Sequence, residues 1–233
     1  MSVTNELLLH EEVMLLSLKD KEGTVVSGAH YQYALAGAML AELLMAGKIE
    51  VEERKKKKYA RLKDSVPTGN AEIDECLNKI IRSKKKQQLA TWVSRFSGLK
   101  ALKNRVARGL VDRGILRADE DRVMLLFTRK IYPEVDPIPE RELTGRLRRA
   151  VLSDSEDIDP RTVVLLSLAK AADLLKVVID KKQRKERKKR IERIVNGEVT
   201  GKAAREAIEA MQAAVFVACI MPAIITTTVT AGH

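Results

Sequence analysis

The sequence predicts a mainly α-helical protein, a single-domain helical bundle over residues 1–233 that is decorated with β-hairpins. Three observations carry this prediction. Apolar residues recur at helical spacing in most segments. In two places a helical segment ends at a glycine and is followed by two short alternating stretches, the pattern of a hairpin. A hydrophobic content of 45% in a chain of this length is enough for one sizeable core.

The N-terminal third shows the first helix–hairpin unit. Leucines at helical spacing predict an amphipathic helix over Asn5–Leu18. The segment His30–Ala46 is apolar nearly all round, so we expect a central, buried helix. Gly47 ends it, and alternation on both sides of a basic run predicts a hairpin over residues 48–63 with Arg54–Lys58 at its tip.

The middle of the chain repeats this unit. A turn at Ser65 leads into a helix that ends near Ile80, and a short helix carries Trp92 and Phe96. A further helix ends at Gly114, and the second hairpin is expected over residues 115–130. Its strands are predicted at Ile115–Arg117 and Val123–Phe127, joined by a polar turn. A helix followed by a hairpin is also the outline of a winged helix, so a DNA-binding protein is the alternative function.

The last third is predicted to be helical. One helix starts after Pro139, and another starts at Asp159, an N-cap residue followed by proline, with a core run over Val163–Ile179. The segment 181–193 holds nine basic residues and is expected to be a cationic helix. A solvated face, an anionic membrane contact and a nucleic-acid contact stay open for it. The apolar run Ala213–Ile225 is too short to span a bilayer and predicts a buried helix, with membrane insertion as the alternative.

The net charge of the chain indicates which classes of binding partner to expect. The chain carries 43 Lys and Arg against 32 Asp and Glu, a net charge of +11, which favours a polyanion or an anionic membrane surface. Aromatic residues make up only 3%, so there are few platforms for unpaired bases and nucleic acid is a less favoured partner. Cys76 and Cys219 match no metal-ligand spacing and are expected to be free, buried thiols in a reducing compartment. Acidic residues interrupt the N-terminus, so no secretory signal is predicted and the protein should be cytoplasmic.

The sequence shows no catalytic constellation. The three histidines, His10, His30 and His233, stand in no metal-binding or triad pattern, and no glycine-rich phosphate loop is present. Asp74 and Glu75 are adjacent on a predicted helix and therefore point about 100° apart. We expect a non-enzymatic protein without catalytic residues, metal or cofactor.

Five ordered blocks resemble the Golgi phosphoprotein 3 family. They read EEVMLLSLKDKEG, GAMLAELLMAGKI, PTGNAEIDECL, LVDRGIL with LLF, and DPRTVVLLSLAKAADLL, and they lie between Leu7 and about Leu175. The resemblance implies a helical bundle with β-hairpins. It also implies a peripheral membrane protein that binds phosphatidylinositol 4-phosphate on the cytosolic face of the Golgi and acts as a trafficking adaptor retaining glycosyltransferases. The chain looks like a divergent or prokaryotic-type member.

The family's lipid pocket carries over in part. Its pair of basic residues before LVxxGxL maps onto Lys100 and Lys103, whose three-residue spacing predicts both ammonium groups on one helix face. The family's pocket arginine falls on Ala36, and the loop Thr24–His30 has no tryptophan. Headgroup specificity should therefore be weaker, because lysine offers a point charge in place of a bidentate fork. The family's arginine-bearing N-terminal arm has no counterpart before the first helix, which leaves glycosyltransferase or coat-protein partners without a predicted contact.

Two further surfaces are predicted. The hairpin tip should add a cationic contact to lipid headgroups through Arg54, Lys55, Lys56, Lys57 and Lys58, with a merely solvated turn as the alternative. The second hairpin holds five apolar residues in succession, some of which must face away from the parent helices. We therefore expect a homo-oligomer interface that includes Val123, Leu125 and Phe127, as the resemblance also implies.

Overall fold

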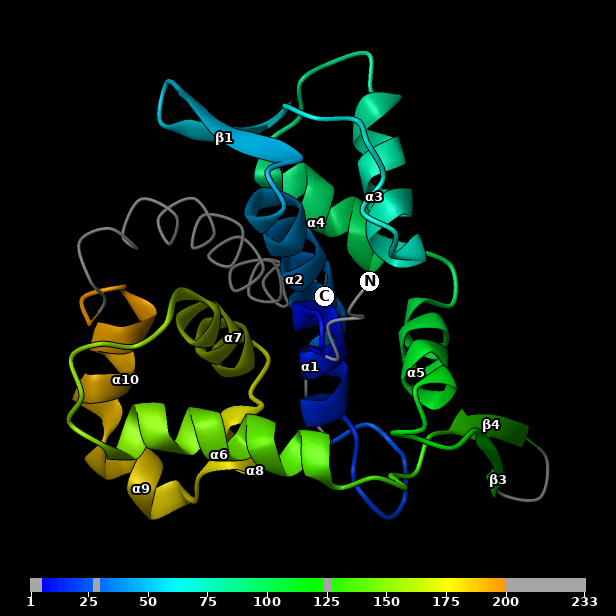
Figure 1. The fold of residues 1–233 in the computed structure, drawn as a ribbon, viewed down its shortest axis with the longest axis vertical. Helices are drawn as coiled ribbons and strands as arrows, with labels where there is room; N and C mark the ends of the chain where they lie inside the picture. The colour runs from blue at the N-terminus through cyan, green and yellow to red at the C-terminus, as the bar shows by residue number, and fades with distance from the viewer. Residues whose placement is uncertain (1–5, 27–29, 124–126, 200–233) are drawn as a thin grey trace, which may run out of the picture.

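The computed structural model describes residues 6–26, 30–123 and 127–199, and in them the chain is mainly helical with two antiparallel hairpins (Figure 1). The predicted fold class is confirmed. The helices are α1 Leu9–Ser17, α2 Tyr31–Met45, α3 Ala71–Ile81, α4 Leu89–Ser97, α5 Leu102–Asp112, α6 Ile138–Leu152, α7 Pro160–Ala171, α8 Leu175–Val178, α9 Lys181–Glu186 and α10 Lys188–Val195. The strands are β1 Ile49–Arg54, β2 Lys57–Leu62, β3 Asp119–Val123 and β4 Phe127–Ile131.

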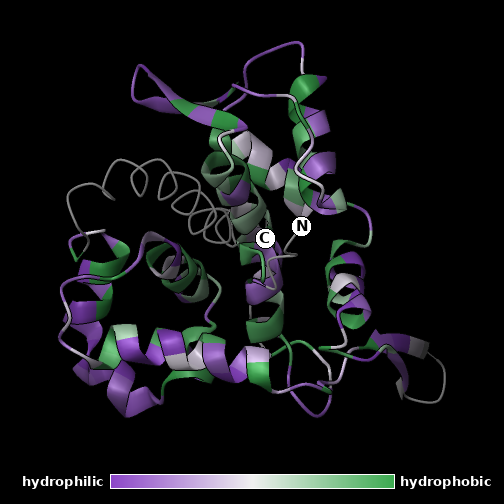
Figure 2. Cartoon of the chain, viewed as in Figure 1, coloured by the Kyte–Doolittle hydropathy of each residue, from purple (hydrophilic) through white to green (hydrophobic). Residues whose placement is uncertain are grey.

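Helices α1 and α2 form the centre of the molecule. Every residue of α1 is buried, and so is the run Ala34–Leu43 of α2, as its apolar composition predicts. Helix α1 packs against α2, α5, α6 and α7, while α2 also contacts α3 and α4. Helices α8, α9 and α10 form a further layer on α6 and α7. Hydrophilic residues are plentiful on α6 and α9 (Figure 2).

A buried ion network fixes the start of α1. The Arg161 guanidinium of α7 lies 3.4 Å from a Glu12 oxygen and 3.3 Å from a Glu42 oxygen, and it donates a hydrogen bond to the Leu7 carbonyl. Glu42 also accepts a hydrogen bond of 2.5 Å from the Leu9 backbone N–H. One arginine therefore joins α1, α2 and α7, and its carboxylate partners are buried.

The first hairpin places its basic run at a tight turn. Strand β1 pairs with β2 in register from Ile49↔Leu62 to Arg54↔Lys57, which leaves Lys55 and Lys56 as the two turn residues. Both have positive φ angles, 49° and 62°. A two-residue turn of this kind normally uses asparagine and glycine, so two lysines adopt a backbone conformation that costs them free energy.

The second hairpin differs from the prediction. The expected strand Ile115–Arg117 forms no ladder, and only Leu116 makes an isolated bridge, to Glu134. The polar stretch expected to be the turn instead forms strand β3, which pairs with β4. Ion pairing across the ribbon explains the shift, because the Arg129 guanidinium lies 2.6 Å from its cross-strand partner Asp121.

The predicted core helix Val163–Ile179 is also interrupted. Helix α7 ends at Ala171, and α8 begins only at Leu175. Asp173 lies between them in a left-handed conformation with φ of 56°, which a continuous helix does not allow. The basic segment is likewise divided, because α9 ends at Glu186 and α10 begins at Lys188.

Two remaining predictions concern the cysteines and the C-terminal apolar run. Cys76 is a free, buried thiol, and burial raises its pKa far above the ordinary value. Cys219 and the run Ala213–Ile225 lie outside the described residues. Among the helices that the structure does describe, none is long and apolar enough to cross a bilayer.

Candidate functional site

A basic pocket lies where α2, α5 and β4 meet, and we call it the α2–α5 pocket. It has a volume of about 380 Å³. Its wall comes from the first turns of α2 and α5, the end of α4 and strand β4, and is formed by Tyr31, Gln32, Leu35, Ser97, Leu99, Ala101, Leu102, Lys103, Asn104, Arg129 and Lys130. Segments about 100 residues apart in the chain therefore build one site.

The N-termini of two helices open into this pocket. Tyr31 and Gln32 begin α2, and Leu102 to Asn104 begin α5. Neither helix has a side chain that caps its first N–H groups. The first N–H groups of a helix lack partners within the helix and carry partial positive charge, so each end favours an anion. Two such ends at one pocket make its polarity suitable for a negatively charged group.

Three basic side chains add full charges to the pocket. Lys103 is half-buried, and its Nζ lies 5.8 Å from the centroid of the Tyr132 ring. Burial, followed by the nearby charge of Arg129, lowers the pKa of the Lys103 ammonium below its ordinary value. An anion bound beside Lys103 would offset both effects. Arg129 and Lys130 are exposed on β4, and Arg129 is held by its ion pair with Asp121.

A close backbone contact sets the position of Tyr132. Its N–H donates a hydrogen bond of 2.9 Å to the carbonyl of Gly23, in the turn after α1. Gly23 has a φ of 59°, and a Cβ atom there would lie 2.3 Å from the Pro133 nitrogen. Only glycine fits this contact, which fixes the chain just after β4 against the centre of the fold.

The α2–α5 pocket differs in charge from two other hollows in the described part of the chain. A hollow of about 730 Å³ beside α1 and α6 has Glu6, Glu12, Asp136 and Glu142 in its wall as well as arginines. Another of about 650 Å³ contains acidic side chains from the turn after α1 and from α6. Its Glu140 has a pKa raised to about 8, first by burial and then by the charges of Asp20 and Glu134. Among the described residues, no carboxylate lines the α2–α5 pocket.

The structure separates the two predicted headgroup lysines. Lys103 lines the pocket in the first turn of α5, whereas Lys100 is exposed in the turn before that helix. Ala101 between them has a left-handed backbone, with φ of 52° and ψ of 29°. The prediction that one helix face carries both ammonium groups is therefore wrong, because Lys100 is not part of the helix.

The hairpin tip is exposed and only partly neutralised. Arg54 forms an ion pair with Glu52, which also accepts a hydrogen bond of 2.6 Å from Lys86, and the hydrogen bond from Lys86 is the first cause that lowers the pKa of Glu52. No carboxylate of the described residues pairs with Lys55, Lys56, Lys57 or Lys58. These four lysines remain available as a membrane contact.

The predicted oligomer interface cannot be placed on the surface of this molecule. Strand β3 ends at Val123 and β4 begins at Phe127, and these two residues face each other in the backbone register. Leu125 and the side chains of Val123 and Phe127 lie outside the described residues. Self-association through this hairpin stays a prediction.

Sequence reasoning missed Arg129 and Lys130 as pocket residues. They belong to a basic pair in the stretch FTRK at the end of the predicted second hairpin, so the signal was present in the chain. What the sequence lacks is the information that β4 passes the start of α5. That contact depends on the tertiary anchoring of Tyr132 by Gly23.

Comparison with known proteins gives a consistent result. A sequence model of the Golgi phosphoprotein 3 family matches residues 9–211. The vacuolar protein sorting-associated protein 74 of Schizosaccharomyces pombe is 30% identical over an alignment of 220 residues, and the alignment covers 81% of this chain. The matched part is 65% of the length of that relative. With a family match over most of its length, the chain belongs to the Golgi phosphoprotein 3 family.

Proposed function

We propose that the protein is a peripheral membrane protein that binds an anionic lipid headgroup in the α2–α5 pocket and serves as a membrane-trafficking adaptor. The observation that supports this most is the charge of the pocket, in which three cations and two helix N-termini meet and to whose wall the described residues contribute no carboxylate. Family membership and the family's name point to Golgi membranes. The favoured ligand is a phosphorylated inositol headgroup, phosphatidylinositol 4-phosphate by resemblance.

The pocket and the hairpin tip have different roles in this proposal. Lys103 is half-buried, so its contact with a phosphate would exclude water and depend on the shape of the headgroup. The exposed lysines of the tip would add attraction to any anionic surface, each contributing about 1 kcal/mol near the membrane. Selectivity should therefore depend on the pocket, while salt sensitivity should depend on both.

Vesicle co-sedimentation tests the proposal directly. Vesicles of phosphatidylcholine alone are compared with vesicles that also contain phosphatidylserine or phosphatidylinositol 4-phosphate. The parent protein should bind the phosphoinositide vesicles best and release them as salt is raised, because screening shortens to roughly 3 Å at 1 M salt. Equal binding to neutral vesicles would contradict the proposal.

A pair of neighbouring lysines supplies the matched control. Lys103→Gln removes a pocket cation and should weaken phosphoinositide binding by about tenfold or more, the usual loss for a hydrogen bond to a charged group. Lys100→Gln removes the same charge three residues away, outside the pocket, and should change binding by less than about fivefold. Equal losses in the two variants would mean that the pocket does not hold the headgroup.

A further inference from the structure

Three of the arginines in the basic segment 181–193 make contacts inside the fold. The Arg187 Nη1 lies 2.8 Å from an Asp154 oxygen, and the Arg193 Nη2 lies 2.7 Å from a Glu156 oxygen. Arg190 is buried, and its Nε donates a hydrogen bond of 3.0 Å to a backbone carbonyl of α6. These arginines fasten α10 to α6 and to the acidic loop between α6 and α7.

Four of the five lysines in the same segment have no such partner among the described residues, whereas Lys182 lies 4.0 Å from a Glu186 oxygen. Lys181, Lys185, Lys188 and Lys189 are exposed, and no carboxylate of the described residues forms an ion pair with them. Lys181 and Lys185 are four residues apart in α9, the spacing of side chains on one side of a helix, and Lys188 and Lys189 begin α10. We call these four residues the lysine face.

The side chains of the lysine face do not pack in the hydrophobic core. Helix α9 has no buried residue, and α10 is held by its arginines and by the apolar residues Ile191 and Ile194. Like charges gathered on an exposed helix repel one another and lower the stability of the fold slightly. These lysine charges add nothing to the packing of the core. An anionic partner outside the molecule therefore explains their clustering better than a role in the stability of the fold.

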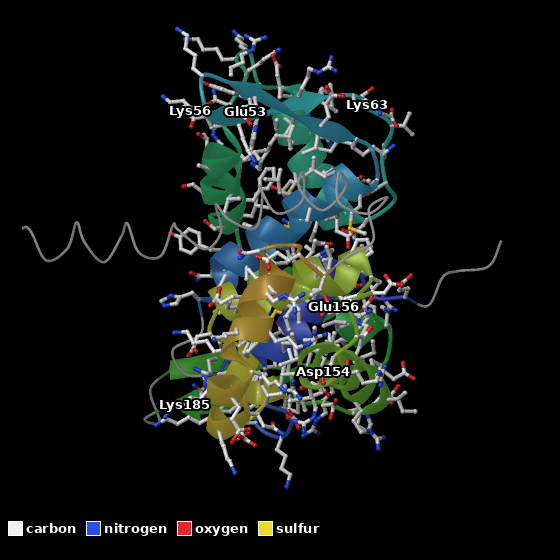
Figure 3. All side chains as sticks on the ribbon, turned by 90° about the vertical axis from the view of Figure 1, so that its left-hand side faces the viewer. Glu53, Lys56, Lys63, Asp154, Glu156 and Lys185 are labelled. Carbon is white, nitrogen blue, oxygen red and sulfur yellow. The ribbon has the colours of Figure 1, made fainter. Side chains whose placement is uncertain are left out.

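The hairpin tip lies on the same edge of the molecule. In the view of Figure 3, Lys56 is at the upper left and Lys185 at the lower left, whereas Asp154 and Glu156 lie to the right of both. In Figure 1 the hairpin β1–β2 and helix α9 stand at opposite ends of the long axis. Lys56 of the hairpin tip and Lys185 of the lysine face thus lie along one edge of the molecule, and Asp154 and Glu156 of the acidic loop lie further from that edge.

We propose that the lysine face is a second membrane-contact site, which binds anionic phospholipid headgroups together with the hairpin tip. The inference rests on the proposed function and extends it to a surface outside the α2–α5 pocket. A bilayer presents anionic headgroups over a continuous plane, so it can meet both lysine groups at once, and two linked contacts bind more tightly than either alone. Lysine suits this role, since its compact charge needs no fixed ligand geometry.

A bilayer fits these lysines better than a nucleic acid does. None of the three hollows described above is lined by a lysine of either group. No aromatic residue occurs within the segment 181–193 on which a base could stack. Binding to duplex DNA is retained as an outcome of the test.

The test uses the full chain and phosphatidylcholine vesicles with and without phosphatidylserine, so that no phosphoinositide is present to occupy the pocket. The triple variant Lys181→Gln, Lys185→Gln, Lys188→Gln should bind the phosphatidylserine vesicles at least about tenfold more weakly, from about fivefold per lost contact. The control Lys21→Gln, Lys63→Gln, Lys79→Gln removes three exposed charges elsewhere. It should lose less than about threefold.

The outcomes separate this inference from the proposed function. If both triple variants lose binding equally, net charge alone acts and the lysine face is not a site. If the lysine variant binds vesicles like the parent but loses duplex DNA, the surface serves nucleic acid and the inference is wrong. If the parent binds phosphoinositide vesicles and ignores phosphatidylserine, the inference fails while the pocket proposal stands. Failure of the parent on every anionic vesicle refutes both.

Stability is checked in the same samples. Because α9 buries no residue, the triple variant should unfold at the temperature of the parent. Should its midpoint fall, Lys185→Glu alone carries the test. This reversal at one exposed position should weaken phosphatidylserine binding by more than about tenfold, and unchanged binding would overturn the inference.

Discussion

Replacing His10 should reduce the stability that the fold loses between pH 7.5 and pH 5. His10 lies in α1 with 1% of its surface exposed, and its Nδ1 has no hydrogen-bond partner within the part of the chain that the structure describes. Burial, followed by the nearby charge of Arg161, lowers the pKa of its imidazole from 6.5 to about 3. Above pH 6.5 the imidazole is neutral in both the folded and the unfolded chain, so it contributes no pH dependence there.

The magnitude follows from the two pKa values. As pH falls below 6.5, His10 becomes protonated in the unfolded chain but stays neutral in the folded chain. The free energy of unfolding therefore decreases until pH approaches 3. At pH 5 the loss is about 2 kcal/mol, since each unit of pH below the unfolded pKa costs about 1.4 kcal/mol. In a protein of this size that corresponds to about 4 to 8 °C in the unfolding midpoint.

Thermal or urea unfolding at pH 7.5 and pH 5 measures this loss. His10→Leu should lose about 2 kcal/mol less than the parent between these values, whatever its own stability. The raised pKa of Glu140 acts with the opposite sign, because its contribution is present below pH 4.5 and lost as pH rises toward 8. That effect is common to both proteins and cancels in the comparison. The exposed His30→Gln is the control, and parallel losses in parent and His10→Leu would refute the reasoning.

Three other substitutions test features of the fold. Arg161→Leu leaves Glu12 and Glu42 buried without their common partner and should cost about 3–5 kcal/mol, measured by urea unfolding; a loss below about 1 kcal/mol would show that the network is not stabilising. Gly23→Ala forces a side chain onto the Pro133 backbone and should cost roughly 3 kcal/mol in the same assay, with near-parent stability as the contrary result. Lys55→Asn with Lys56→Gly places preferred residues in the left-handed turn and should raise the unfolding free energy by about 1 kcal/mol; a decrease would contradict the turn geometry.

The local sequence pattern predicted a helix best where a single physical cause determines its burial or its start. Helix α2 is apolar on every side and must be buried, and α7 begins where Asp159 and Pro160 signal a start. The break after α7 escaped prediction because Asp173 adopts a left-handed conformation without a glycine or proline to announce it. Strand β3 escaped because its charged residues looked like a turn until β4 supplied Arg129 as a partner for Asp121.

The candidate site was predictable in part. Lys103 was predicted from the family resemblance, because a sequence match assigns a role to a position without knowledge of the structure. Arg129 and Lys130 join it only because the chain after β4 is anchored at Gly23, a contact between residues more than 100 positions apart. Arg161 shows the same limit, because nothing in the residues around it distinguishes a buried ionic centre from an exposed charge on α7.

Helix α9 has a practical consequence for the handling of this protein. A helix that buries no side chain contributes little to the cooperative unit, so it should open locally at a small fraction of the global unfolding free energy. It is also rich in lysine and arginine, the residues after which trypsin cleaves. Limited trypsin treatment should therefore cut first within residues 181–189. A preparation nicked there would still run as one folded particle, so denaturing gels should accompany every binding experiment.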